Sequence, residues 1–167
     1  MDARGKKILI ADDEPDILEI ISYNLKIEGY EVATARDGDE AIQKARHFKP
    51  DLIILDVMMP HKNGMEVCKI LRSQPAYHET LIIFLTALSD ELSHVRGLEY
   101  GADDYLSKPV SPRVLVTKVN SLFRRYSKTE ENQVLEIGDI RIDPKQFLVQ
   151  YKDQNINLAK KEFELLY

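Results

Sequence analysis

Short apolar runs alternate with amphipathic stretches along the first 126 residues of the chain. The apolar runs have the length of buried strands and lie at Ile8–Ala11, Tyr30–Thr34, Leu52–Leu55, Leu81–Leu85 and, more weakly, Tyr105–Leu106. The stretches between them have the spacing of helices with one buried face, at Asp16–Ile27, Gly38–Phe48, Asn63–Arg72, Glu91–Tyr100 and Ser111–Arg125. This alternation predicts an α/β fold, a doubly wound, flavodoxin-like parallel sheet with strand order 2-1-3-4-5.

The pattern changes after Tyr126. Residues 127–133 are polar and carry no large apolar side chain, which indicates a linker. Val134–Ile142 and Phe147–Leu158 show the alternation of antiparallel strands, and a helix is expected to begin near Ala159. We therefore expect a first domain at residues 1–126, a linker at 127–133 and, at 134–167, a small antiparallel β fragment that opens a truncated second domain.

Charge and cysteine content narrow the class of protein. The formal charge of -5 argues against a chain that binds nucleic acid through phosphate contacts. The single cysteine, Cys68, excludes an internal disulfide and is expected in the core of the third helix. No apolar run approaches the length of a signal peptide core or a membrane span, so a cytoplasmic location is expected.

Residues suited to phosphoryl chemistry occur where the predicted strands end. Asp12 and Asp13 follow the first strand, Asp56 the third, Thr86 the fourth and Lys108 the fifth. Open parallel sheets bind ligands beyond the carboxyl ends of their strands, so we expect these side chains to meet in one cleft.

The expected cleft has a definite chemistry. Crowded carboxylates repel one another, and a cluster of oxygen ligands suits Mg²⁺. Asp56 is then the nucleophile that forms an acyl phosphate, and Lys108 binds a phosphoryl oxygen. Thr86 can donate a hydrogen bond to the new phosphate and thereby report its arrival.

Other interpretations remain open at this point. An aspartate after a strand is often a helix N-cap, which we expect of Asp16 or Asp37. A phosphohydrolase uses similar residues, but Met58, two residues after Asp56, cannot serve as the general acid that such enzymes usually need. An interaction module that no longer accepts phosphate is the third class, and the intact residue set argues against it.

The motifs closely resemble those of the response-regulator receiver family across residues 6–126. They are Asp12-Asp13, Asp56 followed by Val57-Met58-Met59-Pro60 and Gly64, Thr86-Ala87, and Lys108-Pro109. The resemblance implies that Asp12, Asp13, Asp56 and the backbone carbonyl of Met58 bind Mg²⁺. It implies that Asp56 receives its phosphoryl group from a sensor histidine kinase, and that the protein is a phospho-acceptor rather than an enzyme. It also implies a cis peptide bond before Pro109.

The segment Gly97–Leu106 is similar to the OmpR/PhoB subgroup of transcription factors, whose receivers form homodimers through the fourth helix, fifth strand and fifth helix. The resemblance implies pairs across a twofold axis that involve Asp103, Asp104, Lys118 and Arg125. His94 and Val114 stand where the subgroup commonly has a basic and an acidic partner, so one such pair is expected to be missing.

The tail resembles the start of the winged-helix DNA-binding domain of that subgroup. Leu135–Asp143 and Phe147–Leu158 match its N-terminal sheet, and Lys160–Tyr167 matches the opening of its first helix. DNA binding is therefore expected of a full-length protein with the complete effector domain and not of this chain.

Two further expectations concern signalling. Phosphate on Asp56 is expected to draw in Thr86, and the ring of Tyr105 then fills the vacated space and stabilises a dimer. Ile17 and Ile20 of the first helix, with Pro109, are candidates for kinase docking. The alternative is that this helix is simply buried between its neighbours.

Overall fold

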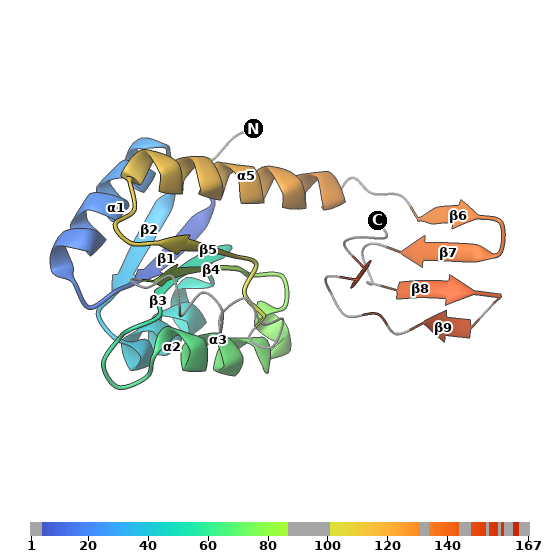
Figure 1. Ribbon diagram of the computed structural model, residues 1–167, viewed down its shortest axis with the longest axis horizontal. Helices are drawn as coiled ribbons and strands as arrows, with labels where there is room; N and C mark the ends of the chain where they lie inside the picture. Colours follow the sequence, from blue (N-terminus) through green and yellow to red (C-terminus); the bar gives the residue numbers. More distant parts are fainter. Residues whose placement is uncertain are drawn as a thin grey trace. The chain divides into compact units, whose positions relative to one another are not determined.

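The computed structural model describes residues 5–86, 101–130, 134–143, 148–152, 154–156, 158 and 162–163. The chain forms two compact units, Met1–Asn120 and Ser121–Tyr167. The fourth helix, expected at 91–100, lies outside the residues that the structure describes. Element labels follow Figure 1.

The first unit is built on a parallel sheet with the predicted strand order, β2-β1-β3-β4-β5 (Figure 1). Its strands are β1 Lys7–Ala11, β2 Glu31–Ala35, β3 Leu52–Asp56, β4 Leu81–Thr86 and β5 Asp104–Ser107. The central strands β3 and β4 are buried along their whole length, which explains why their sequences are continuously apolar. The doubly wound, flavodoxin-like fold is confirmed.

Helices cover both faces of this sheet, as Figure 1 shows. The helices are α1 Pro15–Ile27, α2 Gly38–Phe48, α3 Gly64–Arg72 and α5 Pro112–Glu130, with a 3-10 turn η1 at Pro75–Tyr77. Alternate strand residues such as Leu9, Ile53 and Phe84 pack with α2 and α3. Cys68 belongs to that core, as expected, and is fully buried.

Helix ends follow local sequence, with one correction. Asp37 caps α2, as predicted, because its side chain accepts a hydrogen bond from the backbone N–H of Glu40. Asp16 is not a cap, because α1 begins at Pro15 and Glu14 occupies the N-cap position. Proline is favoured at the first helical position, which moves the start of α1 ahead of Asp16.

Helix α5 continues past Arg125, the predicted end of the fifth helix. It reaches Glu130, so residues 127–130 of the predicted linker are helical. Ser127–Glu130 contains neither proline nor glycine, so nothing in it terminates a helix that is already formed. Residues 131–133 lie outside the described part of the chain.

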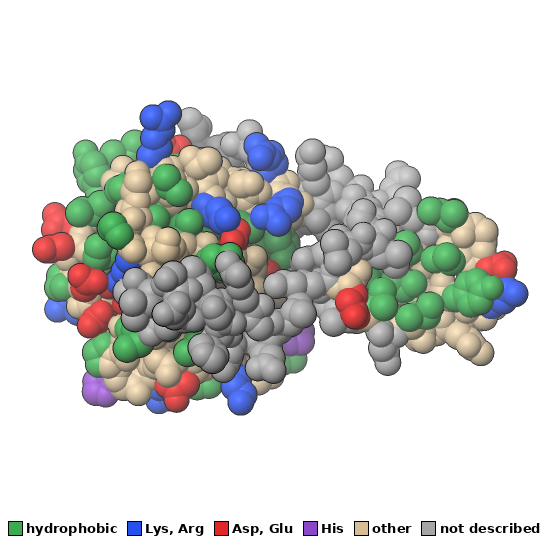
Figure 2. All heavy atoms as spheres, viewed as in Figure 1, with side chains coloured by type: hydrophobic (Ala, Val, Ile, Leu, Met, Phe, Trp, Pro, Cys, Tyr) green, Lys and Arg blue, Asp and Glu red, His purple; other side chains and the backbone are tan. Residues whose placement is uncertain are grey.

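The second unit contains an antiparallel sheet of order β6-β7-β8-β9, which confirms the β fragment. Its strands are Leu135–Ile137, Ile140–Asp143, Leu148–Tyr151 and Gln154–Ile156. Ile142 and Val149 pack with Phe163 on one face of this sheet. The same face also carries exposed apolar side chains at Ile140 and Tyr151. Figure 2 shows hydrophobic side chains gathered over this unit. Residues 159–161 and 164–167, where a helix is expected, lie outside the described residues.

Candidate functional site

Asp12, Asp13 and Asp56 form a carboxylate cluster at the carboxyl ends of β1 and β3. One carboxylate oxygen from each lies within 4.8 Å of the others. The strand register explains the arrangement, because Ala11 pairs with Leu55 and the next residue of each chain segment is an aspartate. Asp12 and Asp56 are buried, whereas Asp13 is exposed to solvent. The sequence-predicted cluster is therefore present.

Lys108 brings one ammonium into this cluster. Its Nζ lies 2.8 Å from Asp12 Oδ2, 3.1 Å from Asp56 Oδ2 and 3.0 Å from Glu14 Oε1. The backbone N–H of Lys108 donates to the carbonyl of Thr86 at 2.6 Å, which ties the residue to the end of β4. A cis peptide bond joins Lys108 to Pro109, as expected.

The acid–base properties of the site follow from burial and charge. Burial and the neighbouring Asp12 carboxylate raise the pKa of Asp56 above its usual value, and Lys108 only partly offsets this. Burial acts to lower the pKa of Lys108, but its contacts with Asp12, Glu14 and Asp56 outweigh burial and raise it. Lys108 is therefore a permanent cation, and Asp56 carries a negative charge that its surroundings disfavour.

The site fits a bound divalent cation. Asp12 Oδ2 is fully buried and has no directed hydrogen bond, although it lies within ion-pair distance of Lys108. A single ammonium leaves the negative charge of the cluster uncompensated, and buried carboxylates need a charge partner. Carboxylate oxygens in this number are ligands for Mg²⁺. The backbone N–H of Met58 approaches Asp56 Oδ1 at 3.3 Å, so Met58 borders the cluster.

The loop from β3 to α3 holds Asp56 through close backbone contacts. A Cβ atom at Gly64 would lie 2.2 Å from the carbonyl oxygen of Asp56, so only glycine fits there. Asn63 and Glu66 form a capping box, which satisfies the first backbone N–H groups of α3. This loop geometry explains why glycine follows Asp56 by eight positions.

Thr86 and Tyr105 lie on neighbouring strands. Phe84 pairs with Tyr105 and Thr86 with Ser107, so Thr86 and Tyr105 share one face of the sheet. Thr86 is fully buried, and Tyr105 is 36% exposed. Their movement on phosphorylation remains a prediction.

Asp103 is held inside its own subunit. Its Oδ2 accepts hydrogen bonds from Arg72 Nη2 and from the backbone N–H of Ile82, both at 2.8 Å. Only 6% of its side chain is exposed, and its pairing across a dimer interface stays a prediction. Sequence reasoning missed the contact because Arg72 lies 31 positions away.

The other expected dimer residues are differently placed. Asp104 Oδ2 forms an ion pair with Lys118 Nζ at 2.9 Å within the same chain. Arg125 is exposed, and Val114 is 53% exposed with no charge to offer. His94 lies outside the described residues. A dimer through this face stays a prediction.

The candidate docking residues border solvent. Ile20 is 49% exposed, Ile17 is partly buried and Pro109 is exposed. The buried face of α1 instead uses Leu18, Ile21 and Leu25. Ile20 continues into an exposed stripe with Tyr23 and Ile27, seen as hydrophobic side chains over α1 in Figure 2. Kinase docking remains untested.

Glu14 is a site residue that sequence reasoning did not assign. It belongs to the run Asp12-Asp13-Glu14 at the end of the first strand, and this position was the available signal. Its contact with Lys108 spans 94 positions and depends on the fold.

Within the described residues, no helix is long and apolar enough to span a membrane.

Known proteins match this chain in sequence and in fold. Residues 8–120 match the response regulator receiver domain family. The chain is 46% identical over 171 residues to the alkaline phosphatase synthesis transcriptional regulatory protein PhoP of Bacillus subtilis, covering 97% of this chain and 70% of that protein. It is 39% identical over 166 residues to the DNA-binding response regulator MtrA of Mycolicibacterium smegmatis, covering 99% of this chain and 71% of that protein.

Solved structures agree. The response regulator DrrB, an OmpR/PhoB homolog of Thermotoga maritima, is 37% identical with a TM-score of 0.62, covering 96% of this chain and 70% of that one. The chemotaxis response regulator CheY4 of Vibrio cholerae is 38% identical with a TM-score of 0.66, covering 70% of this chain and 97% of that one. The chain belongs to the response regulator receiver family and is similar to its OmpR/PhoB-type transcriptional regulators.

Proposed function

We propose that this chain is the phosphorylation-dependent switch of a transcriptional regulator, which accepts a phosphoryl group on Asp56 from a sensor histidine kinase. The observation that carries the proposal is the meeting of Asp12, Asp13, Asp56 and Lys108 at one edge of the sheet. All four residues lie within the stretch that matches the receiver domain family.

The transfer uses Asp56 as nucleophile. A carboxylate oxygen of Asp56 attacks the phosphorus of a phosphohistidine, a P–O bond forms, and the electron pair of the breaking P–N bond passes to the imidazole nitrogen. Lys108, which already contacts Asp56 Oδ2, donates to a phosphoryl oxygen. Burial and the nearby Asp12 destabilise the negative charge on Asp56. The transfer relieves this, because the charge moves from the carboxylate onto the phosphoryl group.

Mg²⁺ belongs to the proposal. Asp12, Asp13 and Asp56, with the backbone carbonyl of Met58, would hold the ion. When bound, it would neutralise negative charge on the transferred phosphoryl group. Support comes from the buried Asp12 oxygen without a directed hydrogen bond.

The output is a change in dimerisation. Thr86 moves toward the phosphoryl group, and Tyr105 follows into the vacated space on the same face of the sheet. The carboxylate of Asp104 links β5 to α5, because it accepts a hydrogen bond from the backbone N–H of Tyr105 and forms an ion pair with Lys118. In a twofold dimer, Asp104 exchanges its own Lys118 for a basic residue of the second copy.

Partners follow from this mechanism. The kinase approaches where the phosphoryl group enters, next to Ile17, Ile20 and Pro109. DNA is bound through a complete effector domain; the relative MtrA is named a DNA-binding response regulator. Control of transcription by this chain therefore passes through the dimer that its first unit forms.

The test is intact mass and sedimentation after treatment with acetyl phosphate and Mg²⁺. The wild-type chain is expected to gain one phosphoryl group and shift from monomer to dimer. Asp56→Asn should gain none, whereas Asp16→Asn, which removes an exposed carboxylate on α1, should behave like wild type. Absence of an adduct on the wild-type chain would refute the proposal, and an adduct without a dimer would refute its output.

A further inference from the structure

Three carboxylates surround the Lys108 ammonium. A lysine ammonium has three protons. Carboxylate oxygens of Asp12, Glu14 and Asp56 lie 2.8, 3.0 and 3.1 Å from its Nζ. Lys108 donates hydrogen bonds to Glu14 and Asp56 and lies at ion-pair distance from Asp12, so a phosphoryl group on Asp56 has to compete with these carboxylates for the ammonium.

Glu14 is the contact that costs least to break. The side chain of Glu14 is 60% exposed, whereas those of Asp12 and Asp56 are 0% and 5% exposed. Water can solvate a released Glu14 carboxylate but cannot reach a released Asp12, and exposed ion pairs are weak. The three contacts thus differ in strength by their surroundings, not by their lengths.

The side chain of Glu14 contacts Lys108 instead of capping α1. Glu14 occupies the N-cap of α1, yet its side chain makes no capping hydrogen bond. Its backbone N–H instead donates to Asp12 Oδ1 at 2.9 Å, which fixes the residue beside the cluster. Its carboxylate is therefore available for a role at the site.

We propose that Glu14 is a positioning residue that holds the Lys108 ammonium in the unphosphorylated protein and releases it to the phosphoryl group on Asp56. The inference rests on the proposed phosphorylation of Asp56. Glu14 keeps the ammonium at the mouth of the cluster, and it also competes with the incoming anion for that ammonium. Glu14 thus holds the Lys108 ammonium in place before the phosphoryl group arrives, and it also lowers the affinity of the site for that group.

The test uses fluoroberyllate, an analogue of the phosphoryl group, at saturating Mg²⁺. Calorimetry measures its affinity, and fluorine NMR reports the donors around its fluorine atoms. Glu14→Gln removes the competing charge and is expected to bind the analogue about three- to fivefold more tightly, the size of an exposed ion pair. Acetyl phosphate should phosphorylate this variant faster by a similar factor.

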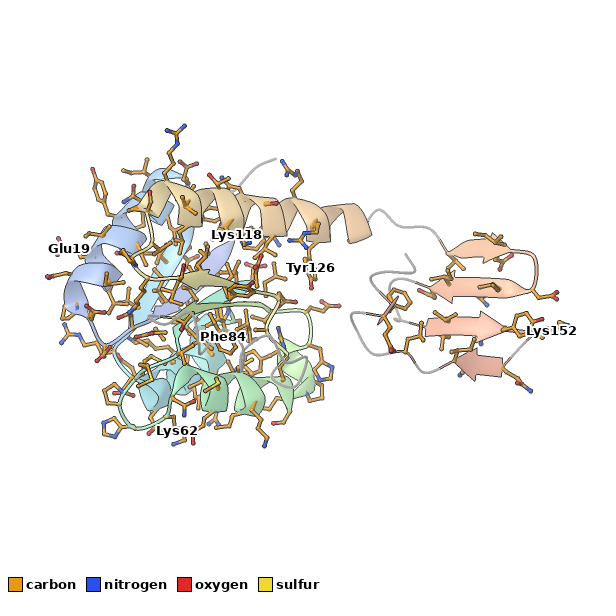
Figure 3. All side chains as sticks on the ribbon, viewed as in Figure 1. Glu19, Lys62, Phe84, Lys118, Tyr126 and Lys152 are labelled. Atoms are coloured by element: carbon orange, nitrogen blue, oxygen red, sulfur yellow. The ribbon has the colours of Figure 1, made fainter. Side chains whose placement is uncertain are left out.

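Two further variants separate contact from charge. Glu19→Gln removes an exposed carboxylate from the same helix (Figure 3) and should leave the affinity unchanged. Glu14→Asp keeps the charge but is one methylene shorter, so it should also bind the analogue more tightly than wild type. The bound fluorine spectra of wild type and Glu14→Gln should coincide, because Glu14 has released Lys108 in both.

The outcomes are separable. Equal affinities for Glu14→Gln and Glu19→Gln would overturn the role of Glu14, as would a Glu14→Asp that behaves like wild type. Different bound spectra would show that Glu14 remains on Lys108, which overturns the release. A wild-type chain that binds no fluoroberyllate at all would overturn the proposed function itself, and the inference with it.

Discussion

Arg72 is expected to be an essential structural residue of the first unit, far along the chain from the residues it holds. Its Nε donates to the carbonyl of Gly101 at 2.7 Å, and its Nη1 to those of Tyr77 and Thr80 at 2.5 and 2.7 Å. Its Nη2 pairs with Asp103 at 2.8 Å. One guanidinium thus joins α3, the η1 turn and the segment that leads into β5.

Replacement of Arg72 by Met removes all of these donors. The side chain of Asp103, 6% exposed, would lose its ion pair with Arg72 and keep the hydrogen bond from the backbone N–H of Ile82. Breaking a buried pair in this way costs about 3 kcal/mol of unfolding free energy. For a unit of this size, that loss lowers the thermal midpoint by about 10 °C.

Urea titration and calorimetry measure this loss. Arg72→Lys is expected to fall between wild type and Arg72→Met, because an ammonium keeps the charge but cannot reach every acceptor. Arg46→Met, an exposed arginine in the last turn of α2, is the matched control and should change stability by less than about 0.5 kcal/mol. If Arg72→Met is no less stable than Arg46→Met, the reasoning about this contact is wrong.

Other predictions test the site and the output. Because the pKa of Asp56 is raised in the folded protein, its contribution to stability is present at low pH and is lost as pH rises above 3.8, the usual pKa of an aspartate. Without metal at neutral pH, Asp56→Asn should therefore melt at a higher temperature than wild type. This difference in melting temperature should close on acidification or on adding Mg²⁺. Gly64→Ala places a Cβ 2.2 Å from the Asp56 carbonyl and should cost about 2 kcal/mol in urea titrations while slowing phosphorylation. Lys118→Glu places a carboxylate beside that of Asp104, so the variant should still be phosphorylated but should not dimerise. A phosphorylated dimer of this variant in sedimentation would contradict the proposed interface.

The fold was predictable because buried parallel strands leave few alternatives. Each predicted strand of the parallel sheet agrees with the structure within one residue at either end, since continuous apolar runs such as Leu52–Leu55 have no other place in a sheet of this type. The site followed from the fold, because Asp12 and Lys108 stand directly after a strand and Asp56 is the last residue of one. Position at a strand end was enough to bring them together.

What the sequence did not predict depends on contacts between distant residues. The aspartate pair Asp103-Asp104 looks uniform in sequence, yet Arg72 binds the first inside the unit while the second pairs with Lys118. Glu14 contacts Lys108 across 94 positions, although local rules would make it a simple helix cap. The end of α5 was missed because polar residues without proline or glycine continue a helix as readily as they form a linker.

The central claim is that Asp56 is the phospho-acceptor, and trapping the acyl phosphate tests it most directly. The chain is treated with phosphoramidate, a P–N donor like phosphohistidine, and Mg²⁺, then reduced with borohydride and mapped by peptide mass spectrometry. Borohydride converts an aspartyl phosphate to homoserine. The account predicts homoserine at position 56 and at no other carboxylate; an unmodified Asp56, or homoserine at the exposed Asp13 instead, would contradict it.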